Sequence, residues 1–115
     1  MSTINQKQID HSLNITNTVI EATEHFQGLV KARELNQAFF MFESIVEGIQ
    51  ALSKVGYINS THQNLSEKLA KNILLIAKSL ENNKQTKIAE ITQFSLMPNL
   101  KKLQLLFKES NQINQ

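Results

Sequence analysis

This 115-residue chain has no cysteine. The side chains that could perform chemistry are its three histidines and ten acidic residues. Without a thiol, thiolate catalysis, disulfides and cysteine-based zinc sites are excluded. The densest titratable cluster is Glu21-Ala-Thr-Glu24-His25. Di-iron bundles need Glu-x-x-His pairs that point inward, and this spacing does not match. A helical wheel places all three side chains on a polar face, so we expect them to be exposed to solvent.

Glu43 and Glu47 are a second candidate, because they lie one helical turn apart. Paired carboxylates perform general acid–base catalysis where a pocket separates their pKa values. The wheel places this pair beside Gln50 and Lys54, on a solvated face. The sequence has no glycine-rich phosphate loop and no nucleophile elbow. We therefore expect a protein that is not an enzyme and that uses no cofactor, metal or small-molecule substrate.

Charge is distributed unevenly along the chain. Residues 1–53 carry three basic and six acidic side chains, whereas residues 54–115 carry nine basic and four acidic ones. Either the helices have differently charged solvated faces, or the basic half contacts an acidic partner, a nucleic acid or an antiparallel second copy. Nucleic-acid binders usually add arginine and stacking aromatic residues, of which this chain has few. Nucleic-acid association is therefore the alternative function, and it would use Lys68, Lys71, Lys78, Lys84 and Lys87.

Phe40 is the residue that most suggests a binding surface. In Ala38-Phe-Phe-Met-Phe42, the wheel places Phe39 and Phe42 on the core stripe but Phe40 among charged residues. An aromatic side chain on a polar face is a candidate contact with a partner or a second copy. Alternatively, another helix of the same chain covers it. With the segment around the single proline, the candidate partner-binding residues are Phe40, Met41, Phe94, Met97 and Pro98.

Long helices must position these residues, because the chain has only one proline and three glycines to break them. Apolar periodicity predicts helices over about 4–30, 34–55 and 61–80, and a fourth from about 84. The first has a broad apolar face that suggests burial against more than one neighbour. Gly28 indicates a turn or bend there, although a continuous helix remains open. Gly56 occupies a place typical of a left-handed residue after a helix, and Ser60-Thr-His-Gln63 is typical of a capping box.

Pro98 divides the apolar pattern of the last segment. Before it, one face holds Ile88, Ile91 and Phe94. After it, a face about 150° away on an ideal wheel holds Leu96, Leu100, Leu103 and Phe107. Proline clashes with the carbonyl four residues back and disfavours helical angles at the preceding residue, Met97. We therefore expect a kink or a break, with Ser95 able to cap a new helix, and burial of both Ile91 and Leu103.

Two stretches, Phe42-Glu-Ser-Ile-Val-Glu-Gly-Ile-Gln-Ala-Leu52 and Ile88-Ala-Glu-Ile-Thr-Gln-Phe-Ser-Leu-Met-Pro98-Asn-Leu, resemble a group of small helical Firmicutes proteins with no assigned function. Those proteins show Ile-x-x-Gly-Ile in a middle helix and Leu-Pro-x-Leu after an acidic, apolar helix. Here Gly48-Ile49 and Met97-Pro98-Asn99-Leu100 fill these places, and Gln93 replaces an acid. The resemblance implies a helical bundle without enzymatic activity. In size and layout the chain is also similar to bacterial flagellar-type export chaperones.

These observations predict an all-α protein with a single domain over residues 1–115. Its architecture is an antiparallel bundle of four main helices, the last kinked or broken at Pro98, with residues 109–115 frayed. The polar start of the chain and its short apolar runs predict a cytoplasmic protein without membrane insertion. We expect a non-enzymatic adaptor or small chaperone, which binds a partner helix or a second copy of itself through apolar helix faces.

Overall fold

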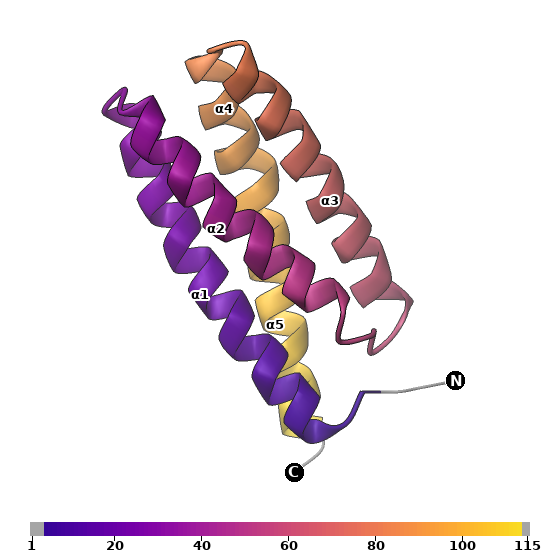
Figure 1. The fold of residues 1–115 in the computed structure, drawn as a ribbon. Coiled ribbons are helices and arrows are strands. Elements are labelled where there is room, and N and C mark those ends of the chain that lie inside the picture. Colours follow the sequence, from indigo (N-terminus) through magenta and orange to yellow (C-terminus); the bar gives the residue numbers. More distant parts are fainter. Residues whose placement is uncertain (1–3, 114–115) are drawn as a thin grey trace.

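The computed structural model of the chain describes the backbone of residues 4–113 and the side chains of residues 4–110. Its elements are α1 (Gln6–Lys31), α2 (Leu35–Ser53), α3 (Ser60–Glu81), α4 (Gln85–Ile91), the π-helical turn η1 (Thr92–Leu96) and α5 (Met97–Ile113). Because α4, η1 and α5 follow one another without interruption, they act as one long helix. The chain passes along a body of 44 × 20 × 20 Å four times, in alternating directions (Figure 1). The predicted all-α antiparallel bundle is confirmed.

The two turns at one end of the bundle have the same conformation. Arg33 after α1 and Asn83 after α3 both have positive φ, at 61° and 52°. The amide of Glu34 donates to the carbonyl of Leu29 at 2.9 Å, and the amide of Lys84 donates to the carbonyl of Ser79 at 2.9 Å. These bonds are those of a Schellman motif, which normally has glycine at the left-handed position. The bundle therefore consists of two helical hairpins that are closed in the same way.

Replacing Arg33 with glycine should raise the free energy of unfolding by up to about 1 kcal/mol, because an L-residue pays a steric cost at positive φ that glycine does not. Urea unfolding monitored by circular dichroism measures this change. Asn83→Gly is the matched control and should gain less, since asparagine tolerates this conformation better. A lower urea midpoint for Arg33→Gly would show that the arginine side chain makes a stabilising contact.

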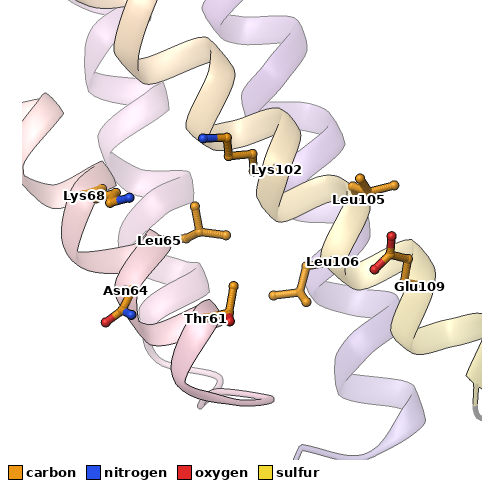
Figure 2. A pocket seen from close by; sticks show the side chains of 8 residues that line it. All are labelled: Thr61, Asn64, Leu65, Lys68, Lys102, Leu105, Leu106 and Glu109. Carbon is orange, nitrogen blue, oxygen red and sulfur yellow. The ribbon is translucent and has the colours of Figure 1, made fainter.

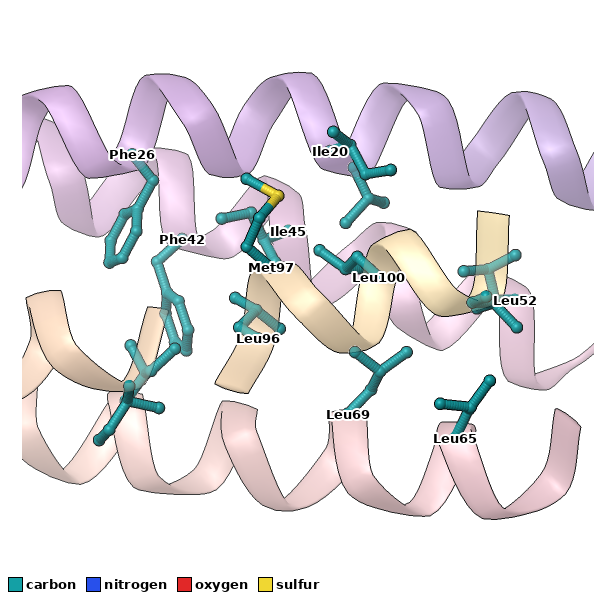
Figure 3. Packing of buried hydrophobic residues seen from close by; sticks show 14 of the residues in the cluster. Ile20, Phe26, Phe42, Ile45, Leu52, Leu65, Leu69, Leu96, Met97 and Leu100 are labelled. Atoms are coloured by element: carbon teal, nitrogen blue, oxygen red, sulfur yellow. The ribbon is translucent and has the colours of Figure 1, made fainter. Parts of the chain in front are cut away.

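The core lies between α1 and its neighbours. Buried residues recur along α1 every three or four positions: Ile9, Ser12, Thr16, Val19, Ile20, Thr23, Phe26 and Val30. They pack against both α2 and α5, so the prediction that the first helix has more than one neighbour is confirmed. Phe26 meets Phe42 of α2 with ring centroids 5.9 Å apart (Figure 3). Gly28 does not interrupt the helix, which continues to Lys31.

The proline is accommodated by a π-helical turn instead of a break. The amide of Met97 donates to the carbonyl of Thr92, five residues back, so this turn contains one extra residue. One residue corresponds to about 100° of rotation, which removes most of the mismatch between the two apolar faces. Ile91 and Leu103 are consequently both buried, as predicted.

Two expectations about this segment are wrong for the same reason. Met97 keeps helical angles (φ −61°, ψ −47°), and Ser95 lies inside the turn instead of capping a new helix. The wider turn relieves the crowding that proline creates with the preceding backbone. It also rotates Phe94 out of the face that it was predicted to share with Ile88 and Ile91, so Phe94 is 71% exposed.

Smaller corrections concern helix ends. Asn59, not Ser60, caps α3, and its side chain accepts a bond from the amide of His62 at 3.0 Å. Gly56 has the predicted positive φ, at 105°. α5 continues to Ile113 and Ser110 is buried, whereas residues 114–115 lie outside the described range, so the fraying of residues 109–115 stays a prediction. In that range, no helix has the length and apolarity needed to cross a membrane.

Candidate partner-binding groove

The five predicted partner-binding residues do not form one site. Phe40 is 70% exposed, so no other helix covers it. Met41 and Pro98 are partly buried. Met97 is only 8% exposed and its side chain points into the core beside Ile45 (Figure 3), so it offers little surface to a partner. Within the described range, the backbone of α2 does not closely approach that of η1 or α5. Phe40 and Met41 on α2 are therefore separated from the candidate residues around Pro98.

A different apolar feature lies between α2 and α3. Two adjoining hollows, of about 300 and 380 Å³, share Val46 in their lining. Besides Val46, the first is lined by Ile49, Gln50, Leu52, Ser53, Ser66, Leu69, Ala70, Ile73, Leu74 and Leu103. The second is lined by Phe39, Phe42, Glu43, Glu47, Ala77 and Glu81. We call the two together the α2/α3 groove.

The groove exists because α2 packs closely on α1 and only sparsely on α3. On the α1 side, Gly48 lies so close to the side chain of Val19 that a Cβ atom at this position would overlap a methyl group. The apolar arc of α2 is wider than this contact. Its remaining part, which includes Val46 and Ile49, is therefore only partly buried and faces the space beside α3. Phe39 was predicted to join the core but is half exposed at the end of the groove.

The charged residues that line the groove are all acidic. Glu43 and Glu47 lie on α2 and Glu81 is the last residue of α3. All three line the second hollow. All three side chains are exposed, which agrees with the solvated face predicted for Glu43 and Glu47. The residues that line the other hollow are uncharged. The groove therefore combines a long apolar floor with one acidic end.

A separate, shallow hollow of about 400 Å³ lies between α3 and α5. In Figure 2, Lys68 of α3 and Lys102 of α5 extend toward the same space, with Leu65 and Leu106 below them and Glu109 at one side. Leu105, at its edge, is 57% exposed. Of the five lysines of the predicted basic strip, only Lys68 lines this hollow, so the fold does not gather that strip here.

A further hollow, of about 590 Å³, lies between α1 and α4, and most of the residues that line it are polar, among them Lys31 and Arg33. Gln85 in this lining already has a structural role. Its Nε2 donates to the carbonyl of Val30 at 2.6 Å and so ties the two hairpins together. The hydrogen bonds of Gln104 to Asn17 (2.7 Å) and of Asn99 to Asn72 (3.0 Å) likewise link helices.

His62 is a buried titratable residue that sequence analysis did not single out. Its side chain is 1% exposed, and its Nδ1 accepts a bond from the amide of Ile58 at 3.0 Å. The rings of Tyr57 and Phe107 pack against it edge-on, with centroids 5.0 Å away in each case. Burial lowers the pKa of His62 to about 4. Through these contacts His62 anchors the α2–α3 loop to the core.

The position of His62 could have been found from a longer periodic pattern. Buried residues of α3 follow one stripe that contains polar members: His62, Leu65, Leu69, Asn72, Ile76 and Ser79. The other titratable cluster has no buried member, because Glu21, Glu24 and His25 are all exposed as predicted. Among residues 4–110, no group of three or more acidic or histidine side chains is placed to hold a metal ion.

Comparison with known proteins gives one match. A family model described as a domain of unknown function (DUF8042) matches residues 8–106, which extend from α1 into α5. No curated protein and no solved structure matches the chain. The resemblance to small Firmicutes proteins and to export chaperones therefore stays a prediction.

Proposed function

We propose that this chain, which belongs to the family of domains of unknown function DUF8042, is a non-enzymatic interaction protein that binds an amphipathic helix of a partner. The partner helix docks in the α2/α3 groove, as in an adaptor or a small chaperone. The observation that supports this function is the groove itself, where Phe39 and Leu74 are exposed at the edges of an apolar floor. A cysteine-free chain fits a reducing compartment, and we propose the cytoplasm as its location.

The dimensions of the groove suit a helix. Its lining on α2 runs from Phe39 to Ser53, which corresponds to roughly 20 Å at about 1.5 Å per residue. A docked helix of three to four turns places apolar anchors at positions i, i+3 or i+4, and i+7 along such a length. The two hollows would each receive one or more of these anchors, and burial of the partly exposed Val46 and Ile49 would contribute to the affinity.

Nucleic-acid association receives less support from the fold. The hollow between α3 and α5 contains two lysines but also Glu109, and its exposed apolar residue is a leucine instead of a stacking aromatic side chain. Single-stranded nucleic acids bind to positively charged grooves with aromatic platforms. The groove with the most apolar lining is instead the acidic one between α2 and α3.

Substitution of Leu74 with aspartate should weaken peptide binding at least about 10-fold, because a charge at the edge of the groove must lose water when the helix docks. The ligand would be a helical peptide selected by the full-length chain from a phage-displayed library of random amphipathic sequences. Its affinity is then measured by fluorescence anisotropy. Leu74 is 70% exposed, so this change should not unfold the bundle.

Leu105→Asp is the matched control, since Leu105 is also exposed, at 57%, but lies on α5 and lines neither hollow of the groove. Its affinity for the selected peptide should equal that of the unaltered chain. If both substitutions weakened binding equally, or if no peptide were selected, the groove would not be the docking site. Sedimentation of the chain alone tests the alternative that a second copy docks in the groove. If the chain forms a dimer and Leu74→Asp dissociates it, the groove binds another molecule of this chain instead of a partner helix.

A further inference from the structure

We infer that the partner helix is basic at one end, with lysine or arginine side chains that lie against Glu43, Glu47 and Glu81 when its apolar stripe fills the α2/α3 groove. This inference rests on the proposed function and specifies the chemistry of the partner. Its basis is the juxtaposition of three carboxylates from two helices around one apolar hollow.

The three carboxylates are placed to act together. Glu43 and Glu47 lie one turn apart on α2, and Glu81 lies across the hollow at the end of α3. In the described part of the chain, none of these three carboxylates makes a hydrogen bond or an ion pair. The hollow between them is floored by Phe42, Val46 and Ala77, with Phe39 half exposed beside it. The site therefore presents unneutralised negative charge next to apolar and aromatic surface.

The charge at this acidic end is opposite in sign to the net charge of the molecule. The chain has 12 basic and 10 acidic side chains and a net charge of +2, yet every charged residue that lines the groove is acidic. Apolar walls around a charged hollow concentrate the electric field there. The groove therefore favours a positively charged ligand even though the protein as a whole is slightly positive.

Docking itself imposes the same preference. A helix that covers the hollow removes water from carboxylates, and this is unfavourable unless a cation replaces the lost hydration. Lysine and arginine can supply that cation while their methylene groups cover apolar surface. The face of Phe39 offers an additional cation–π contact. An acidic or neutral helix would leave the carboxylates unpaired.

Among its described residues, a folded second copy of this chain does not offer such a helix. The apolar stripes of its helices are buried in the bundle, including Leu65, Leu69 and Ile76 of α3 and Leu100, Leu103 and Phe107 of α5. Exposing one of these stripes requires unfolding a hairpin. We therefore assign the groove to a segment of a different protein, with an apolar stripe of three to four turns that ends in two or three basic residues.

The test is peptide selection on two matched charge variants. The unaltered chain should enrich lysine and arginine at one end of the selected helices. Glu43→Lys/Glu47→Lys/Glu81→Lys should enrich aspartate and glutamate there instead. The control, Glu21→Lys/Glu24→Lys/Glu67→Lys, makes the same change in net charge at exposed positions outside the groove, and it should select basic peptides as before. Circular dichroism confirms that each variant is folded.

Affinities of synthetic probes make the result quantitative. A selected basic peptide should bind the unaltered chain at least about 10-fold more tightly than its Lys→Glu counterpart at low salt, and this ratio should fall in about 0.5 M NaCl, where charges are screened. If Leu74-dependent binding showed no preference for basic peptides, or if the control variant shifted the preference equally, the charge inference would be wrong while the groove function stood. If no peptide bound at all, both would fail.

Discussion

Replacing Gly48 with alanine should lower the free energy of unfolding by about 2 kcal/mol, the range expected for overpacking a tight interior contact. The loss is expected although alanine is intrinsically the better helix former. An added Cβ would overlap Cγ2 of Val19, with a second methyl group, of Ile15, nearby. Val19 is buried and its methyl group is attached directly to Cβ, so it has little freedom to move. The measurement is the urea midpoint and slope from equilibrium unfolding.

Gly28→Ala provides the matched control, because nothing lies within 4 Å of the Cβ that this change would add. Gly28 is inside α1, so the same substitution there should stabilise the chain by up to about 1 kcal/mol. Adding Val19→Ala to Gly48→Ala should cost less than the sum of the two single changes, since the smaller side chain makes room for the new methyl group. A neutral or stabilising Gly48→Ala would mean that α1 and α2 do not approach this closely.

The protein should lose about 3 kcal/mol of stability as the pH falls from about 6.5 to about 4, in addition to the effect of its carboxylates. Burial lowers the pKa of His62 from 6.5 to about 4 in the folded chain. Below pH 6.5 the unfolded chain therefore binds a proton at this residue that the folded chain does not. Unfolding is favoured increasingly until the pH reaches the folded pKa. The stabilising contribution is fully present above pH 6.5.

Urea unfolding between pH 7 and pH 4 measures this dependence. His62→Phe should flatten it, while costing roughly 1–2 kcal/mol at pH 7 because the amide of Ile58 loses its acceptor. His25→Gln, on the exposed side of α1, should leave the dependence as it is. An NMR titration that placed the pKa of His62 near 6.5 would contradict the prediction and would indicate that water reaches the ring.

The sequence predicted the helices well because each is encoded locally. Apolar spacing located all four long helical segments to within a few residues, and Gly56 marked the end of the second. The error in the last segment arose where one extra residue alters the helical periodicity. The wheel assumes 100° per residue, so it placed Phe94 on the buried face. The π-helical turn rotated that residue outward.

The candidate site was harder to predict, because it is formed between helices. The wheel identified Glu43 and Glu47 as solvated and Phe40 as a residue outside the core, and all three are exposed. It could not show that Glu81 lies across an apolar hollow from the two glutamates. Met97, which was predicted to bind a partner as part of the segment around Pro98, is buried instead.

The sequence by itself determined the all-helical class, the positions of the turns and the presence of a conflict at Pro98. These features depend on side-chain chemistry and backbone freedom within a few residues. Only the tertiary structure decided how the conflict is resolved, which part of each apolar face is covered, and that α2 and α3 leave a groove with an acidic end. The physical reason is that a helix has more apolar surface than one neighbour can bury. The close approach at Gly48 draws α2 onto α1, and the surface that remains open faces α3.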